Sequence, residues 1–139
     1  LRDNDKDLIF LATGTGIAPI KSILENIKLS KGFQEKKIIL LWGVRNKKDF
    51  YLNNLDTKNK NFKFIPVLSR PSNQCKWNGK VGYIQNILLQ EKIDFSEYVV
   101  YACGSEKMIS DSKNLLIKQG LNESCFFSDA FVDSSDIIL

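Results

Sequence analysis

The sequence has no histidine, and this absence removes several kinds of chemistry at once. No imidazole is available as a general base, a nucleophile or a metal ligand. The three cysteines, Cys75, Cys103 and Cys125, are odd in number and form no C-x-x-C pair. This pattern argues against a disulfide framework, a zinc site or an iron–sulfur cluster held by this chain, and it suits a reducing compartment.

Long hydrophobic runs are absent as well. The longest, residues 8–12 and 38–42, reach only about five residues, whereas a helix that spans a bilayer needs roughly 20. No secretory signal opens the sequence. We therefore expect a soluble cytoplasmic domain with no membrane partner.

A strong excess of charge of one sign is the third missing feature. The net charge is +4, from 20 basic and 16 acidic residues. The lysines are not interleaved with aromatic residues as in a single-strand nucleic-acid binder, so no nucleic-acid partner is expected. We interpret them as solvated helix ends and loops. Weak steering of an anionic ligand or an acidic redox partner is the alternative.

Short apolar runs alternate along the chain with longer amphipathic ones, which is typical of βα units. The strands are expected at residues 8–12, 38–42, 62–68, 98–102 and 124–128. The helices are expected from residue 18 to a stop at Gly32, near residues 49–55, over residues 82–90, and from a cap at Ser105 to Gly120. The predicted fold is a single α/β domain with an open five-stranded parallel sheet and helices on both faces.

The turn after the first expected strand reads Gly14-Thr15-Gly16-Ile17-Ala18-Pro19. In open parallel sheets, ligands bind beyond the carboxyl ends of the strands, near the switch in strand order. Glycines let the backbone approach closely, and the helix start that follows offers unpaired amides to a pyrophosphate. Pro19 stands where G-x-G-x-x-G has its third glycine, so this turn alone fits an ordinary βα connection equally well.

The other expected strand ends carry small, cationic and hydroxyl groups. They are Arg45, the pair Ser69-Arg70, and Cys103-Gly104-Ser105. Taken singly, each has an ordinary explanation: a solvated arginine, the start of a loop, and an inert buried thiol. On one edge of one sheet, together, they are what a bound dinucleotide requires.

Six segments occur in an order that resembles a known family. They are Gly14-Thr15-Gly16-Ile17-Ala18-Pro19, Trp42-Gly43-Val44-Arg45, Ser69-Arg70-Pro71, Gly82-Tyr83-Ile84-Gln85, Tyr101-Ala102-Cys103-Gly104 and Phe127-Ser128-Asp129-Ala130-Phe131. Over residues 8–132 the chain resembles the nicotinamide-nucleotide domain of the ferredoxin–NADP reductase superfamily. In the segments Gly82-Tyr83-Ile84-Gln85 and Asp129-Ala130-Phe131 it looks most similar to bacterial NADH-dependent reductases. These include flavin and iron–sulfur reductases that act on CDP-6-deoxy-3,4-glucoseen, flavin reductases, and reductases of aromatic-ring oxygenases.

The resemblance implies roles for residues at the nucleotide end of the site. Thr15 and the amides of residues 14–17 would hold the pyrophosphate and the nicotinamide-side ribose. Arg45 would lie near the adenosine half, and Ser69 and Arg70 would contact its ribose. The implied cofactor-binding set is Gly14, Thr15, Gly16, Ile17, Ala18, Pro19, Arg45, Ser69, Arg70, Tyr83, Cys103, Gly104, Ser105 and Met108, with no metal ligand.

Other implied roles concern the stacked rings. Tyr83 could pack against adenine, while Cys103 with Gly104 would line the nicotinamide pocket, which Met108 could close. Cys103, Asp129 and Phe131 form the implied catalytic set. Phe131 matches the aromatic residue that covers the flavin, and Asp129 matches a nearby carboxylate that is more often Glu. Ordinary core packing is the alternative for both Tyr83 and Phe131.

Two departures from the family bear on how complete the chain is. It continues past Phe131 through residues 133–139, a tail that could keep this ring from reaching a flavin. The R-x-Y-S/T element of the flavin-binding barrel and a C-x4-C-x2-C cluster motif do not occur. We therefore interpret residues 1–139 as the NAD(P)-binding domain of a larger flavoprotein reductase, near its C-terminal end. FAD is expected in a separate domain of the same polypeptide, and an iron–sulfur cluster there is left open.

The predicted function is hydride transfer from nicotinamide to flavin, with electrons then passing to an iron–sulfur centre or another acceptor protein. By itself, the chain is expected to turn over nothing. The alternative is a non-catalytic nucleotide-sensing or docking module. The resemblance favours NADH, yet residues 69–80 contain Arg70, Lys76 and Lys80 and no acidic residue, which would suit the 2′-phosphate of NADPH.

Overall fold

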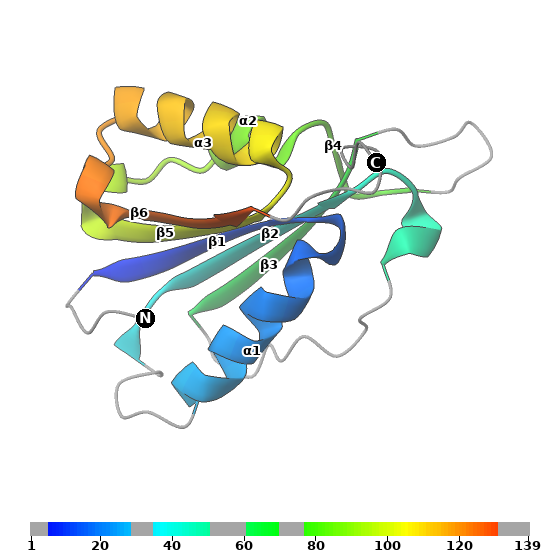
Figure 1. Cartoon of the computed structure of the whole chain (residues 1–139), viewed down its shortest axis with the longest axis horizontal. Helices are drawn as coiled ribbons and strands as arrows, with labels where there is room; N and C mark the ends of the chain where they lie inside the picture. The colour runs from blue at the N-terminus through cyan, green and yellow to red at the C-terminus, as the bar shows by residue number, and fades with distance from the viewer. Residues whose placement is uncertain (1–5, 29–34, 51–60, 70–76, 131–139) are drawn as a thin grey trace, which may run out of the picture.

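The computed structural model of this chain describes residues 6–28, 35–50, 61–69 and 77–130. Its strands are β1 (Asp7–Thr13), β2 (Ile38–Val44), β3 (Phe62–Leu68), β4 (Lys80–Val81), β5 (Tyr98–Gly104) and β6 (Phe126–Ala130). Its helices are α1 (Ile17–Lys28), α2 (Ile84–Leu88) and α3 (Glu106–Lys118). They form three layers, with α1 on one face of the sheet and α2 and α3 on the other (Figure 1).

The sheet has the order β4-β3-β2-β1-β5-β6, and every neighbouring pair is parallel. The predicted parallel α/β fold is confirmed, but the described part of the chain holds six strands rather than five. The additional strand is β4, which pairs with β3 through only two residues, Lys80 and Val81. Both are exposed, so β4 leaves no hydrophobic alternation in the sequence from which it could have been predicted.

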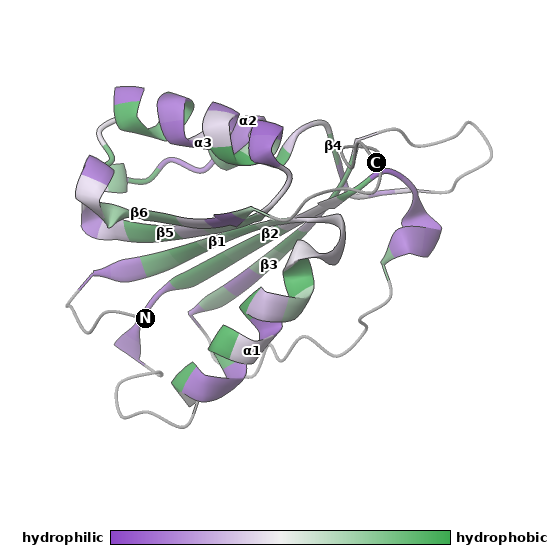
Figure 2. Ribbon diagram, in the orientation of Figure 1, coloured by the Kyte–Doolittle hydropathy of each residue, from purple (hydrophilic) through white to green (hydrophobic). Residues whose placement is uncertain are grey.

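The two faces of the sheet bury alternate residues of each strand, as the pleat requires. On β1, Leu8, Phe10 and Ala12 pack toward α1, whereas Ile9 and Leu11 belong to the core under α2 and α3. The helices complete each layer with their apolar sides, and their polar residues face outward (Figure 2). Because both faces of the central strands are covered, these strands are apolar throughout, as predicted.

Helix boundaries differ from the predicted ones where local turn chemistry intervenes. Ser105 does cap α3, since its Oγ accepts a hydrogen bond from the Met108 amide at 3.2 Å. Gly120, at φ +106°, lies just past that helix. Near residue 49 only a 3-10 turn, Lys47–Asp49, is found, and residues 51–55 and Gly32 lie outside the described residues.

The remaining differences are short shifts of element ends. Tyr83 is extended, so α2 begins only at Ile84 and spans five residues. The last strand begins at Phe126 because Asn122 caps a 3-10 turn over Glu123–Cys125. No helix in the described ranges combines the length and the apolar character that crossing a membrane requires.

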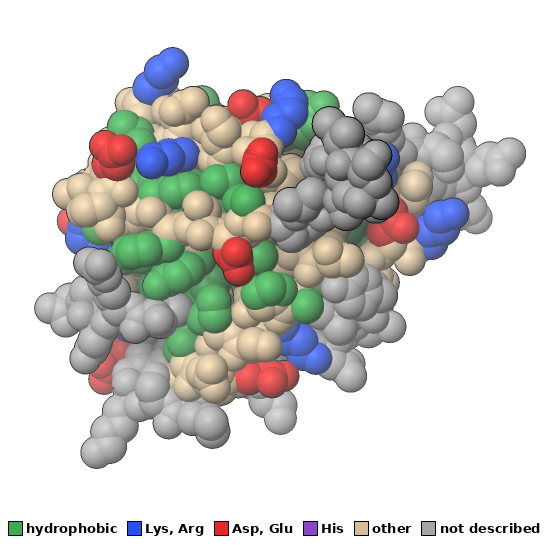
Figure 3. All heavy atoms as spheres, viewed as in Figure 1, with side chains coloured by type: hydrophobic (Ala, Val, Ile, Leu, Met, Phe, Trp, Pro, Cys, Tyr) green, Lys and Arg blue, Asp and Glu red, His purple; other side chains and the backbone are tan. Residues whose placement is uncertain are grey.

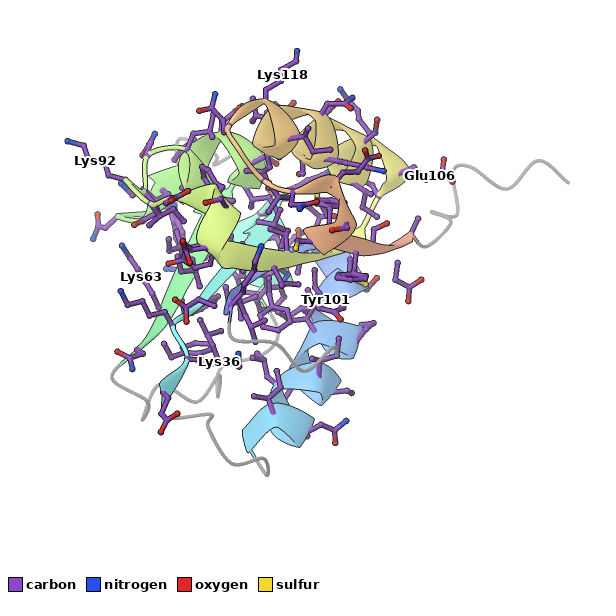
Figure 4. All side chains as sticks on the ribbon, turned by 90° about the vertical axis from the view of Figure 1, so that its left-hand side faces the viewer. Lys36, Lys63, Lys92, Tyr101, Glu106 and Lys118 are labelled. Atoms are coloured by element: carbon purple, nitrogen blue, oxygen red, sulfur yellow. The ribbon has the colours of Figure 1, made fainter. Side chains whose placement is uncertain are left out.

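A row of stacked aromatic rings covers the part of the sheet face beside α1. Phe10 on β1 stacks against Tyr101 on β5 with ring centroids 5.9 Å apart, and Tyr101 stacks against Phe127 on β6 at 5.1 Å. Figure 4 shows Tyr101 on the α1 side of β5. In Figure 3, hydrophobic side chains reach the surface between α1 and the β6 edge. One helix is therefore too narrow to cover this face, and the stacked rings extend the core beyond it.

Candidate functional site

The strand order places a topological switch beside β1. The chain moves from β1 outward through β2, β3 and β4, and then returns to lay β5 on the other side of β1. The turns after β1 and β5 therefore leave the sheet next to each other at its carboxyl edge. In open α/β sheets a crevice at this point is the usual ligand site.

The turn after β1, Gly14–Gly16, is a 3-10 turn that runs directly into α1 at Ile17. Gly14 has φ +54°, a conformation that favours glycine. Gly14 and Thr15 are exposed, whereas Gly16 and Ile17 are buried. Neither the turn nor the first turn of α1 carries an acidic side chain, so no carboxylate competes for the amides at this helix start.

This glycine turn is held from both neighbouring strands. From β2, the indole Nε1 of Trp42 donates a hydrogen bond to the carbonyl oxygen of Gly14 at 2.9 Å. From β5, the backbone of Cys103 lies so close to Gly16 that a Cβ there would overlap the Cys103 carbonyl oxygen. Gly16 is therefore required for the approach of the two turns, while Gly14 has open space around it.

The turn after β5 is formed by Cys103, Gly104 and Ser105. A Cβ on Gly104 would overlap the Oγ1 of Thr13, the last residue of β1. The amide of Ser105 donates to the same Thr13 Oγ1 at 3.3 Å. The two turns that the sequence placed on one edge of the sheet are thus in direct contact through backbone and one hydroxyl group.

Cys103 and Met108 border this turn from opposite faces of the sheet. Cys103 is 6% exposed and belongs to the core under α1. Met108 is 5% exposed, belongs to the core under α2 and α3, and receives a contact from the Ser112 hydroxyl at 3.5 Å. Gly104 directly follows Cys103, and the Met108 methyl group lies 3.1 Å from the position that a Cβ of Gly104 would take.

Asp129 on β6 pairs in register with Cys103 on β5. Burial raises the pKa of the Cys103 thiol, and the negative charge of Asp129 raises it further. The thiol therefore remains protonated near neutral pH and is a neutral, weakly polar group rather than a nucleophile. Phe131, the third member of the predicted catalytic set, lies outside the described residues.

The other candidate residues lie along the half of the carboxyl edge formed by β2, β3 and β4. Arg45 follows β2 and is exposed, Ser69 follows β3 and is half-buried, and the Tyr83 ring is 60% exposed. None of these three side chains makes a hydrogen bond or an ion pair with the part of the chain that the structure describes. Such exposure rules out core packing for Tyr83. Arg70 lies outside the described residues.

Tyr83 also borders an open pocket of about 330 Å³ between α2 and α3. The pocket is lined by Tyr83, Gln85, Asn86, Asp111, Asn114, Leu115 and Lys118. Gln85 is 7% exposed, and sequence reasoning gave it no role. The exposed residues of the motif, Ala18 and Pro19, lie in the first turn of α1.

Sequence reasoning assigned no role to two residues that shape the glycine turns, Thr13 and Trp42. Both looked like ordinary strand residues because their partners, Ser105 and Gly14, are distant along the chain. A signal was present for Thr13 only in its position directly before the glycine motif, where a threonine can cap the following turn.

The sequence model of the oxidoreductase NAD-binding domain family matches residues 10–114 of the chain. The chain therefore belongs to this family, whose fold here is that of the NAD-binding domain in ferredoxin–NADP reductase-like flavoprotein reductases.

Among curated proteins, the chain is similar to the CDP-6-deoxy-L-threo-D-glycero-4-hexulose-3-dehydrase reductase of Yersinia pestis. The two are 37% identical over 137 residues, which cover 96% of this chain and 40% of the relative. A probable flavin reductase of Aliivibrio fischeri is 33% identical and is covered over 55% of its length, against 93% of this chain. The chain thus spans about half or less of these two relatives.

A solved structure described as ferredoxin reductase in carbazole 1,9a-dioxygenase superposes with a TM-score of 0.80 at 18% identity. The match covers 95% of this chain and 40% of the other. At this identity the comparison supports the fold alone.

Proposed function

We propose that this chain is the NAD(P)H-binding domain of a flavin-dependent reductase and that the contact between the two glycine turns forms its dinucleotide site. When bound, the nicotinamide supplies a hydride that a flavin accepts and passes on as single electrons. The chain's own residues have to bind, orient and shield the coenzyme, which needs few ionisable groups. The absence of histidine is therefore no obstacle.

The residues present fit a dinucleotide. The turn Gly14–Gly16 offers uncapped amides and no carboxylate to a pyrophosphate, and Thr15 adds an exposed hydroxyl group. Because Gly104 has no side chain, the Thr13 hydroxyl group can pack directly against the turn after β5. The contact between these two turns, at the switch in strand order, is the observation on which the proposal depends.

The residues around Cys103 fit the nicotinamide end. A small, neutral thiol excludes water without placing a charge beside the ring, and its raised pKa keeps it in that state at neutral pH. Asp129 lies at the adjacent register position on β6. We assign both residues to orientation of the ring, with Phe131 as the cover on the flavin side, and Ala18, Pro19 and Met108 to the walls of the site.

The adenosine end is assigned to the exposed half of the edge. The Tyr83 ring offers a free face for a nucleobase, and Arg45 and Ser69 offer a charge and a hydroxyl group to the ribose. We propose NADH as the preferred coenzyme, as the family resemblance suggests. Arg70 and Lys80 supply the opposing physical argument for NADPH, so Arg70→Ala with both coenzymes is the deciding variant.

We assign flavin binding and electron transfer to the acceptor to the remainder of the polypeptide. The Yersinia pestis relative is named as a reductase of a CDP-6-deoxyhexulose dehydrase, which makes this acceptor class our first candidate. An iron–sulfur centre in the remainder is part of the same proposal. The cysteine pattern supports a cytoplasmic location.

Titration calorimetry of the chain with NADH, NADPH and ADP-ribose tests the proposal. We expect NADH and ADP-ribose to bind and to shift the amide resonances of Gly14, Gly16 and Gly104. Free FAD added to the chain should leave NADH oxidation at background, whereas the complete polypeptide should oxidise NADH rapidly. Binding of the coenzyme without any oxidation by the complete polypeptide would instead support a sensing module.

A further inference from the structure

Thr13 occupies a position where a threonine normally has a different task. It is the residue immediately before the Gly14–Gly16 turn, in extended conformation, as helix-capping residues are. A threonine there usually accepts a hydrogen bond from an amide two or three residues ahead. Thr13 makes no such cap. Its Oγ1 accepts instead from the amide of Ser105, which is 92 residues away in the sequence.

The surroundings of Thr13 are fitted to this arrangement on both sides. Toward β5, its hydroxyl group occupies the place that a Cβ of Gly104 would need. Toward β2, its methyl group lies 3.8 Å from the position that a Cβ of Gly43 would take, and Thr13 and Gly43 are partners in register. A threonine side chain thus fits between two glycines on the strands that flank β1.

The hydrogen bond connects the residue before the Gly14–Gly16 turn to the residue that caps α3. Ser105 is the cap of α3, and its own hydroxyl accepts from the Met108 amide at 3.2 Å. Thr13 therefore connects the start of the β1–α1 turn to the start of α3. Movement of one turn against the other would break this bond and leave the Ser105 amide without a protein acceptor among the described residues.

We propose that Thr13 is a positioning residue for the coenzyme: its hydroxyl group fixes the separation between the turn that holds the pyrophosphate and the turn that borders the nicotinamide. This inference rests on the function proposed above. It explains why the hydroxyl group is directed across the crevice and not into the local cap, which also leaves the Gly14–Gly16 turn without a side-chain cap.

The test uses two substitutions that separate the hydroxyl group from the shape of the side chain. Thr13→Val keeps the branched shape and the β propensity but removes the acceptor. Thr13→Ser keeps the acceptor and removes the methyl group. Affinities of the chain for NADH and for ADP-ribose are measured by calorimetry, with thermal unfolding and the exchange rate of the Ser105 amide proton recorded for each variant.

We expect Thr13→Val to weaken NADH binding by about three- to tenfold, the effect of one lost hydrogen bond. Binding of ADP-ribose, which lacks the nicotinamide, should change by less than about twofold, because it does not have to span both turns. The Ser105 amide should exchange faster. Thr13→Ser should restore NADH affinity and slow exchange, which a purely structural role of the methyl group would not do.

Two results would overturn the inference while leaving the proposed function intact. One is unchanged NADH affinity in Thr13→Val. The other is an equal loss for NADH and ADP-ribose together with a lower unfolding temperature, which is what simple destabilisation produces. If the unsubstituted chain binds neither ligand, the proposed function fails, and this inference fails with it.

Discussion

The two halves of the carboxyl edge of the sheet are built by different means. In the half at β1 and β5, backbone lies against backbone: Gly16 and Gly104 have no room for a methyl group, and Trp42 and Thr13 fix the turns by hydrogen bonds. In the half at β2, β3 and β4, exposed side chains stand apart, as Tyr83 illustrates at 60% exposure. The first half is held together by close packing and hydrogen bonds, whereas the exposed side chains of the second half are accessible to a ligand.

This difference determines what substitutions do. In the close-packed half, a change that affects the ligand also strains the fold, since the same atoms serve both. In the open half, a side chain can be removed at little cost in unfolding free energy, because exposed groups without partners contribute little to stability. Four predictions use this contrast.

Gly16→Ala is expected to have the largest effect. The new Cβ would overlap the Cys103 carbonyl, so the two turns must separate. We expect a loss of about 3 kcal/mol in the free energy of unfolding and no measurable NADH binding. Gly14→Ala is the control, because it meets open space and pays only for its positive φ, about 1 kcal/mol. Equal destabilisation of the two variants in urea titrations would contradict the close-packed description.

Trp42→Phe should come next. It keeps an aromatic ring in the core but leaves the Gly14 carbonyl without its indole donor and opens a small cavity. We expect a loss of about 2 kcal/mol in unfolding free energy, and NADH affinity reduced by several fold.

Trp77→Phe provides a matched control for Trp42→Phe in the open half. The Trp77 indole donates to the Lys80 carbonyl at the same distance, 2.9 Å, but in an exposed setting where water can replace it. Its loss should cost about 0.5 kcal/mol. If Trp77→Phe proved as damaging as Trp42→Phe in chemical denaturation, the two halves would not differ in the way proposed.

Tyr83→Ala should separate binding from stability. With the ring mostly exposed, its removal should change the unfolding free energy by less than about 0.5 kcal/mol. Loss of stacking should weaken NADH binding by about fivefold. Tyr83→Phe, which keeps the ring, should bind normally. Unchanged calorimetric affinity in Tyr83→Ala would remove this residue from the site.

The smallest expected effect concerns pH. Burial and Asp129 raise the pKa of Cys103 in the folded chain above its value in the unfolded chain. The stability associated with the neutral thiol is therefore present below about pH 8.5, the pKa of an unfolded cysteine, and declines as pH rises further. Cys103→Ala should reduce this alkaline decline in thermal unfolding. Tyr98, whose pKa is also raised by burial, contributes only at higher pH and is unchanged in this comparison. An identical decline in both proteins would contradict the assignment.

Much of the fold could be predicted because its signals are local. The buried strands are apolar runs, and the apolar residues of α1 from Ile20 to Ile27 recur at helical spacing. Ser105 is a typical helix-capping residue at the start of α3. The prediction was wrong in the number of strands, since the exposed pair Lys80 and Val81 has no periodicity and pairs only because the end of β3 is open beside it. The candidate site residues were found as separate strand ends, and their roles stay predictions.

The sequence by itself determined the alternation of strands and helices, the two buried faces of the sheet and the glycine turn after β1, because each depends on residues close together in the chain. Only the tertiary structure decided that β5 lies beside β1, and thus that Thr13 contacts Ser105 and that Gly16 contacts Cys103. Contacts across some ninety residues depend on strand order and register, which are set by the packing of the whole sheet and leave no local pattern to recognise.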